Sequence, residues 1–268
     1  MVEGKQMEPA YAKMEYRRLG NTGLKVSVLG YGNWLNSNNK EAYDFTRDSI
    51  KECLQMGVNF FDTAEIYGMG EAERQMGSAF KELNVRRESI VVSTKIWKVG
   101  GGVNDVMNSR KHIIEGLKNS LARLQMDYVD VVYSHRPDYE CSLEETCRAF
   151  HHCIEMGLCF YWGTSEWTAQ RIAAAIGICE KNGWHKPVVE QPQYSMVRRE
   201  KFEKDFHYVF ADYGYGSTIW SPLCGGILSG KYNDGSAPEG SRFEKDGNGV
   251  TFQRYFGPGK KESTLKMF

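Results

Sequence analysis

The sequence has no excess of charge of either sign, because lysine and arginine together number 34, as do aspartate and glutamate. This balance gives no reason to expect a nucleic-acid partner or a charged membrane surface. The sequence also lacks any run of about 18 apolar residues, so no segment is expected to insert into a membrane. The first fourteen residues lack the apolar core of a signal peptide, and we expect residues 1–14 to form a flexible tail.

The sequence also lacks an even number of cysteines: it contains seven, which cannot all be joined in disulfide pairs. Without a signal peptide, this favours reduced thiols and a cytoplasmic location. Four of the cysteines recur every six residues over residues 141–159, with His151 and His152 between them. Six residues rotate a helix by about 600°, so only Cys147 and His151 share a face. Two ligands do not make a zinc site, and the pattern therefore predicts helix packing and no metal.

Short β-branched runs alternate with amphipathic stretches, in an order that predicts seven strands and six helices. Strands are predicted at residues 26–32, 58–63, 89–95, 128–135, 158–165, 187–191 and 216–222. Helices are predicted near residues 41–56, 71–83, 110–124, 142–157, 168–181 and 198–213. Residues 16–19 look like the first arm of a hairpin that leads into the first strand. Such strict alternation predicts a parallel sheet covered by helices.

A parallel sheet of this kind is either open and doubly wound or closed into a barrel. No GxGxxG follows the first strand, which argues against a dinucleotide-binding open sheet. Polar side chains instead collect where the predicted strands end: Asp62, Lys95, His135, Ser165, Gln191 and Ser221. Residues that converge from many strand ends are typical of the mouth of a (β/α)-barrel. After Pro222 the alternation stops, and no further full amphipathic helix is predicted.

Four residues near these strand ends suit the reduction of a carbonyl group by hydride: Asp62, Tyr67, Lys95 and His135. The reaction needs an acid, and a tyrosine can serve if its pKa falls from about 10 towards about 7. A neighbouring ammonium ion produces such a shift, a carboxylate can hold that ammonium ion, and a histidine can hydrogen-bond the carbonyl oxygen. Taken singly, each residue also has an ordinary structural interpretation as a packing, solvated, capping or turn residue. Their combination favours an active site.

Three segments, FDTAEIYG, SIVVSTK and YVDVVYSHRPD, closely resemble the aldo-keto reductase family. The resemblance runs from about Glu15 to the end of the chain. Within the family, the segments SRKHIIEGLKNSLARLQMDYVDVV, YWGTSEW and WSPLCGGILSGKY are similar to the cytoplasmic β subunits of voltage-gated potassium channels. The resemblance implies a (β/α)8 barrel with an N-terminal hairpin, formed by residues 15–268.

The resemblance also implies roles for individual residues. Asp62, Tyr67, Lys95 and His135 correspond to the catalytic tetrad of the family, and Ser165 and Gln191 correspond to residues that hold the nicotinamide carboxamide. Further contacts with the cofactor, NADP(H), are implied for Trp220, Ser221, Leu223, Lys231 and Arg242. Trp34 lies near the substrate mouth and the cofactor, and Asp62 is implied in cofactor binding as well.

The sequence departs from the pattern of the channel subunits in places. Those subunits generally carry asparagine where this chain has His135, which favours a working reductase. Glu166 stands where they tend to have arginine, and a carboxylate there is expected to repel a phosphate. The motif for the adenosine 2′-phosphate follows the eighth strand in the family. We therefore expect the chain to lack the seventh helix and the eighth βα unit, and to hold the cofactor weakly.

A glycine-rich segment, GGILSGKY at residues 225–232, fits GxxxxGK but ends in tyrosine. A nucleotide-hydrolysing P-loop needs serine or threonine there for Mg²⁺, so we interpret the segment as a loop whose amides approach the cofactor pyrophosphate.

Three functions remain open from the sequence. The first is an NADPH-dependent reductase of aldehydes or ketones, and the second is a redox-sensing subunit of a potassium channel. The third is an inactive fragment. Resemblance to the channel subunits further implies a homotetramer.

Overall fold

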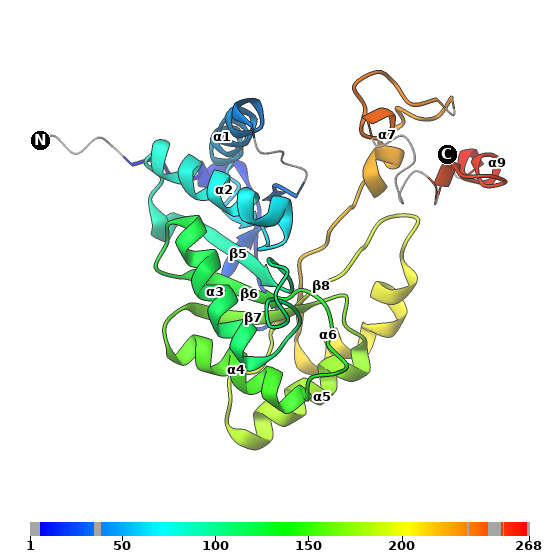
Figure 1. Cartoon of the computed structure of the whole chain (residues 1–268). Coiled ribbons are helices and arrows are strands. Elements are labelled where there is room, and N and C mark those ends of the chain that lie inside the picture. Colours follow the sequence, from blue (N-terminus) through cyan, green and yellow to red (C-terminus); the bar gives the residue numbers. More distant parts are fainter. Residues whose placement is uncertain (1–5, 35–38, 235, 246–252, 254, 267–268) are drawn as a thin grey trace, which may run out of the picture. The chain divides into compact units, whose positions relative to one another are not determined.

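The computed structural model describes residues 6–34, 39–234, 236–245, 253 and 255–266 (Figure 1). The chain separates into two compact units. The first comprises residues 1–191 and 206–218, and the second comprises residues 192–205 and 219–268.

The first unit contains a seven-stranded sheet in which every neighbouring pair of strands is parallel. Its strands follow the sequence order: β3 (Gly30–Gly32), β4 (Phe60–Asp62), β5 (Val91–Ile96), β6 (Val129–Ser134), β7 (Cys159–Ser165), β8 (Val189–Gln191) and β9 (Gly216–Ser217). A parallel sheet of seven strands in sequence order is therefore confirmed, although the first and last strands differ from the predicted ranges. Among the described residues, no strand pairing joins β3 to β9.

Helices follow the strands as predicted: α1 (Lys40–Gln55), α2 (Glu71–Glu82), α3 (Arg110–Leu124), α4 (Leu143–Glu155), α5 (Ala169–Asn182) and α6 (His207–Tyr213). Consecutive helices from α1 to α6 lie side by side along the sheet (Figure 1). Four of them begin at a side-chain cap, which satisfies an otherwise unpaired amide of the first turn. The capping residues are Asn39, Ser109, Ser142 and Thr168.

Both faces of the sheet are buried. Neighbouring residues of a strand point to opposite faces, so each face contributes its own set of buried side chains. Phe61, Val92 and Val132 belong to a large cluster shared with the helices. The preceding residues, Phe60, Val91 and Val131, belong to a smaller cluster on the other face. That second cluster includes Leu19 and Val26 of the N-terminal hairpin, formed by β1 (Tyr16–Arg18) and β2 (Lys25–Ser27). The first unit is thus a partial (β/α)-barrel whose inner layer is covered by a hairpin.

The prediction of a single strand at residues 26–32 is wrong, because two strands of different sheets share this segment. β2 ends at Ser27 and pairs with β1, whereas β3 starts at Gly30 and pairs with β4. The change of direction is held by Ser27, whose Oγ donates to the carbonyl oxygen of Leu29 at 2.6 Å. The Ser27 amide donates to the Asn59 side chain at 2.7 Å. Alternating apolar residues continue through this turn, so the pattern did not reveal it.

The helix predicted at residues 198–213 is also interrupted. A wide π-type turn occupies Lys201–Asp205, and α6 begins only at His207. A regular helix would place Phe202 and Phe206 on one face. However, Phe202 stacks on Tyr194 with ring centroids 4.2 Å apart, whereas Phe206 is buried in the core of the first unit. The extra residue of a π-type turn rotates these two side chains apart.

The second unit has a small core of its own, which contains Cys224, Ile227, Tyr232, Phe243 and Tyr255. Its described helices are short: α7 (Arg242–Lys245), α9 (Lys261–Leu265) and the 3₁₀ segment η5 (Cys224–Ser229). The strand predicted at residues 216–222 ends early at Ser217, and Trp220 forms only an isolated bridge with Gln193. Pro192 has no N–H for a continued ladder.

Part of the segment expected to be a flexible tail is attached to the first unit. Met7 pairs with Val85, and the amide of Ala10 donates to the carbonyl oxygen of Leu54 at 2.8 Å. These backbone bonds fix residues 7–10, while residues 1–5 lie outside the described residues. No helix in the described part of the chain is long and apolar enough to cross a membrane.

Candidate active site

The carboxyl ends of the parallel strands bring Asp62 and Lys95 together. Asp62 ends β4 and pairs in register with Ser93, two residues before Lys95 on β5. Lys95 Nζ lies 2.5 Å from Asp62 Oδ2 and also donates to the carbonyl oxygen of Thr63 at 2.7 Å. The lysine side chain is 0% exposed. A buried ammonium ion requires such partners, because transfer of an unpaired charge from water is costly.

Lys95 carries a positive charge despite its burial. Burial alone would lower the pKa of the Lys95 ammonium ion, but the charge of Asp62 and the contact with Tyr67 raise it more, so its pKa lies above the ordinary value. Asp62 is itself held by two further donors. Ser93 Oγ donates to Asp62 Oδ1 at 2.6 Å, and Gln191 Nε2 donates to the same oxygen at 3.2 Å. The ion pair is therefore oriented as well as neutralised.

Tyr67 begins the 3₁₀ turn η2 (Tyr67–Gly70), which follows β4. The Lys95 Nζ atom lies 4.8 Å from the centroid of the Tyr67 ring. The ring of His135 meets the Tyr67 ring edge-on, with centroids 5.7 Å apart. The ring of Trp34, which is half exposed, lies 6.4 Å from the Tyr67 ring. The structure thus brings all four predicted catalytic residues together, with Trp34 beside Tyr67.

His135 follows β6 and is buried. Burial, and then the positive charges of Lys95 and Arg136, hold the pKa of His135 well below its ordinary value, so its imidazole is neutral near pH 7. Its Nδ1 atom is buried without a hydrogen-bond partner among the described residues. A neutral imidazole has one N–H donor and one acceptor nitrogen. It can therefore donate to a carbonyl oxygen without taking up a proton.

Ser165 and Gln191 lie opposite each other at the ends of β7 and β8. The hydroxyl of Ser165 donates to the carbonyl oxygen of Gln191 at 2.8 Å, and the side chain of Gln191 reaches both Asp62 and Thr218. A hydroxyl beside a carboxamide offers donors and acceptors that complement a second carboxamide. Gln191 is thus bonded directly to Asp62, and Ser165 is connected to the Asp62–Lys95 pair only through Gln191.

Several supporting residues were missed by the sequence analysis. Ser93 and Thr218 orient the predicted residues, and Arg136 donates to Ser165 Oγ at 3.2 Å and to the carbonyl oxygen of His135. Behind the site, buried Glu65 accepts from the Trp97 amide at 2.5 Å and lies 3.0 Å from His112 Nε2. The only sequence signal for these residues was their position near strand ends.

A second tyrosine is close to the site but is not suited to proton transfer. Tyr133 lies on β6, its hydroxyl is bonded to Thr218 Oγ1 at 2.8 Å, and burial raises the pKa of Tyr133 far above its ordinary value. Of the two tyrosines, Tyr67 is the one whose ring lies beside the ammonium ion of Lys95.

The other predicted cofactor residues belong to the second unit. They are Trp220, Ser221, Leu223, Lys231 and Arg242. Within that unit, Gly225 and Gly226 have φ angles of 73° and 99°, which open a tight glycine turn beside Lys231. Leu223 is exposed, and Arg242 begins α7. The segment is a glycine-rich loop, as its sequence predicts.

Comparisons with known proteins show the family of the chain. Residues 28–261 match the model of the aldo/keto reductase family. A protein of Arabidopsis thaliana named "Probable voltage-gated potassium channel subunit beta" is 50% identical over 230 residues, which are 86% of this chain and 70% of that protein. A rice protein of the same name is 49% identical over equal shares. A "Putative voltage-gated potassium channel subunit beta" of Schizosaccharomyces pombe is 50% identical, over 85% of this chain and 67% of its own length.

Proposed function

Because the chain belongs to the aldo/keto reductase family, whose members generally bind a nicotinamide cofactor, we propose that it reduces an aldehyde or ketone with NADPH. Tyr67 is the general acid of this reaction. The observation that carries the proposal is the buried Lys95–Asp62 ion pair, with its ammonium nitrogen 4.8 Å from the Tyr67 ring. Burial of a lysine side chain is costly, because the ammonium ion loses its hydration. A buried, paired lysine beside a tyrosine is therefore not explained by an ordinary surface role.

Each protein group has a defined part in the proton transfer. The Tyr67 hydroxyl gives its proton to the carbonyl oxygen as negative charge develops there. The Lys95 ammonium ion stabilises the phenolate that remains, and Asp62 keeps Lys95 charged and in place. His135, neutral and edge-on to Tyr67, donates a hydrogen bond to the same oxygen. This donor is in place before the reaction, so it costs no reorganisation.

The cofactor is proposed to lie along the strand ends. Ser165 and Gln191 would hold the carboxamide of the nicotinamide, to which their hydroxyl and amide groups are complementary. When bound, the nicotinamide supplies the hydride. For five residues of the second unit, contacts with the cofactor are proposed from the family resemblance alone: Trp220, Ser221, Leu223, Lys231 and Arg242. Preference for NADP(H) over NAD(H) is proposed from the family resemblance.

Replacing Tyr67 with phenylalanine tests the proposal. The change removes the acidic hydroxyl but keeps the ring and its contacts with Trp34 and His135. Turnover of NADPH with an aromatic aldehyde should fall by about 10²–10⁴-fold, the usual contribution of general acid catalysis. Binding of NADPH, followed by fluorescence titration, should remain nearly unchanged. Turnover within about tenfold of the wild-type value would reject Tyr67 as the acid.

A second candidate function is regulation of a potassium channel, favoured by the names of the relatives that are about half identical to this chain. In this alternative the bound cofactor reports redox state to a channel. The resemblance then predicts a homotetramer. Light scattering at micromolar concentration should give four times the mass of the chain, and a monomer would count against this function. The two functions are compatible, because an active reductase can also bind a channel.

A further inference from the structure

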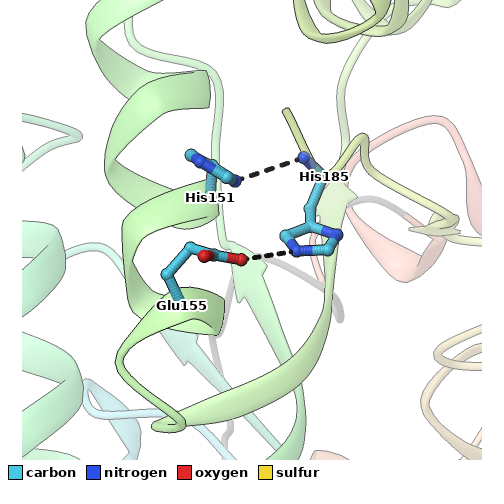
Figure 2. Close-up of side chains that lie close together, drawn as sticks. All are labelled: His151, Glu155 and His185. Atoms are coloured by element: carbon cyan, nitrogen blue, oxygen red, sulfur yellow. Dashed lines mark hydrogen bonds and ion pairs between the residues drawn. The ribbon is translucent and has the colours of Figure 1, made fainter. Parts of the chain in front are cut away.

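A histidine pair and a glutamate meet on the first unit, at the end of the barrel opposite the active site. His151 and Glu155 lie four residues apart on α4, so they share one face of the helix. His185 comes from the segment between α5 and β8 and faces both of them (Figure 2). One ligand atom from each of the three side chains lies within 4.8 Å of the others.

We propose that His151, Glu155 and His185 form a zinc-binding site. Two imidazoles and one carboxylate are a ligand set that zinc takes with water in the fourth position. Bond lengths of about 2.0–2.2 Å place the ligand atoms of a tetrahedral zinc about 3.4 Å apart. The three side chains would therefore close around the ion by roughly an ångström. His185 and Glu155 are exposed, and neither is confined by packing.

The backbone around His185 is held before any ion arrives. The buried side chain of Trp162 donates from Nε1 to the carbonyl oxygen of His185 at 2.8 Å. Without an ion, the amide of His185 donates to His151 Nδ1 at 3.3 Å, and the Nε2 atom of His185 lies 2.9 Å from Glu155 Oε1. Zinc would take the place of these two contacts between the ligand groups. The ring of His151 stacks on Trp184 at 6.1 Å. Partners that fix the orientation of ligands typically raise metal affinity.

The charges around the cluster are compatible with a divalent cation. His152 and Arg148 of α4 face His151 and disfavour a cation there, whereas the carboxylate of Glu155 favours it. Lys186, the neighbouring cation, is paired with Glu180 at 2.5 Å.

The cysteines of this region do not take part. Cys147, Cys153 and Cys159 are buried, and burial raises the pKa of the Cys153 thiol to about 12. A protonated thiol is a poor zinc ligand. The sequence analysis considered only ligands within residues 141–159, so it missed His185. A zinc ion would connect the end of α4 to the segment that precedes β8.

Zinc titration of the untagged chain tests the proposal. Competition against a chromophoric chelator, at a mildly alkaline pH, should show one site per chain. His185→Ala, His151→Ala and Glu155→Gln should each weaken zinc binding by at least about tenfold, the lower end of what loss of a supporting partner alone costs. His152→Ala is the matched control, because His152 lies on the same helix outside the cluster, and the zinc affinity of this variant should not fall below that of the wild type.

Two further readouts separate this site from binding elsewhere. Saturating zinc should raise the unfolding temperature of the wild type and of His152→Ala, but not of His185→Ala, because only a site in the folded state stabilises it. Bound cobalt should show no thiolate charge-transfer band. The proposal is overturned if the three ligand variants bind zinc like the wild type, if no site is detected, or if the cobalt spectrum shows thiolate ligation.

Discussion

At the scale of single residues, His135 combines burial with two neighbouring cations, Lys95 and Arg136. Protonation of this imidazole would place a third positive charge in a site that has one carboxylate, Asp62. Burial and the repulsion between these positive charges disfavour the protonated imidazole, and they hold the pKa of His135 well below its ordinary value. The same property that keeps His135 neutral for hydrogen-bond donation therefore makes the protein sensitive to acid.

Replacing His135 with asparagine should reduce that sensitivity. Because the folded pKa of His135 is below the unfolded value of about 6.5, the unfolded state binds more protons below that pH. The wild type should lose up to about 1.4 kcal/mol of stability per pH unit as the pH falls below about 6.5, and none from this group above it. His135→Asn lacks this loss. Urea unfolding at several pH values would measure the difference, and parallel curves would contradict it.

The tetrad could be predicted from the sequence because its four members stand at recognisable places. Asp62, Lys95 and His135 end predicted strands, and a parallel sheet brings such ends to one edge. The residues that hold them could not be predicted in this way. Ser93 and Glu65 act through hydrogen bonds across strands or to a distant helix, and a periodic pattern contains no information about such partners.

At the scale of elements, the contact between α2 and α3 depends on Gly77. An added Cβ atom there would lie 2.2 Å from the carbonyl oxygen of Leu124. A side chain cannot move out of the way of a backbone atom, so the two helices can approach this closely only at glycine. The close packing of α2 against α3 thus requires a residue without a side chain at position 77.

Alanine at position 77 should push α2 away from α3. We expect a loss of about 1–3 kcal/mol, the usual cost of overpacking, or more. Gly177→Ala is the matched control, because Gly177 lies inside α5 with no atom within 4 Å of the added Cβ. That change should stabilise the protein by up to about 1 kcal/mol through helix propensity. Chemical denaturation measures both values, and equal effects of the two changes would contradict the explanation.

Element boundaries were predicted well where local signals mark them. The capped helices α3, α4 and α5 begin within two residues of their predicted positions. Each is preceded by a serine or threonine whose side chain caps the first turn: Ser109, Ser142 and Thr168. The predictions failed where tertiary contacts override periodicity. Residues 26–32 change sheets at Ser27, and residues 198–213 contain a wide turn that separates Phe202 from Phe206.

At the scale of the whole molecule, two units with separate cores differ greatly in size. The first unit has buried residues on both faces of a sheet and beneath six helices, whereas the core cluster of the second contains five buried residues. Regions with few buried apolar contacts open locally at low free-energy cost. The glycine-rich loop, for which cofactor contacts are proposed, belongs to the smaller unit.

Hydrogen exchange should distinguish the two units. Amides of α7 and η5 should exchange much faster than those of α3 and β6, because the second unit opens without unfolding the barrel. Tyr232→Ala removes a ring that stacks on Phe243 at 4.7 Å and should abolish the remaining protection in the second unit. Protection in the first unit should not change. Uniform protection, or equal loss in both units, would contradict this picture.

The position of Trp34 has an optical consequence. Of the six tryptophans, Trp34 is the exposed one, at 50% exposure, while Trp162 and Trp167 are fully buried. Its indole lies 6.4 Å from the Tyr67 ring. A dissolved quencher reaches an exposed indole far more readily than a buried one. The protein therefore contains an accessible fluorophore beside Tyr67, and a ligand that binds next to Tyr67 should shield Trp34 from iodide.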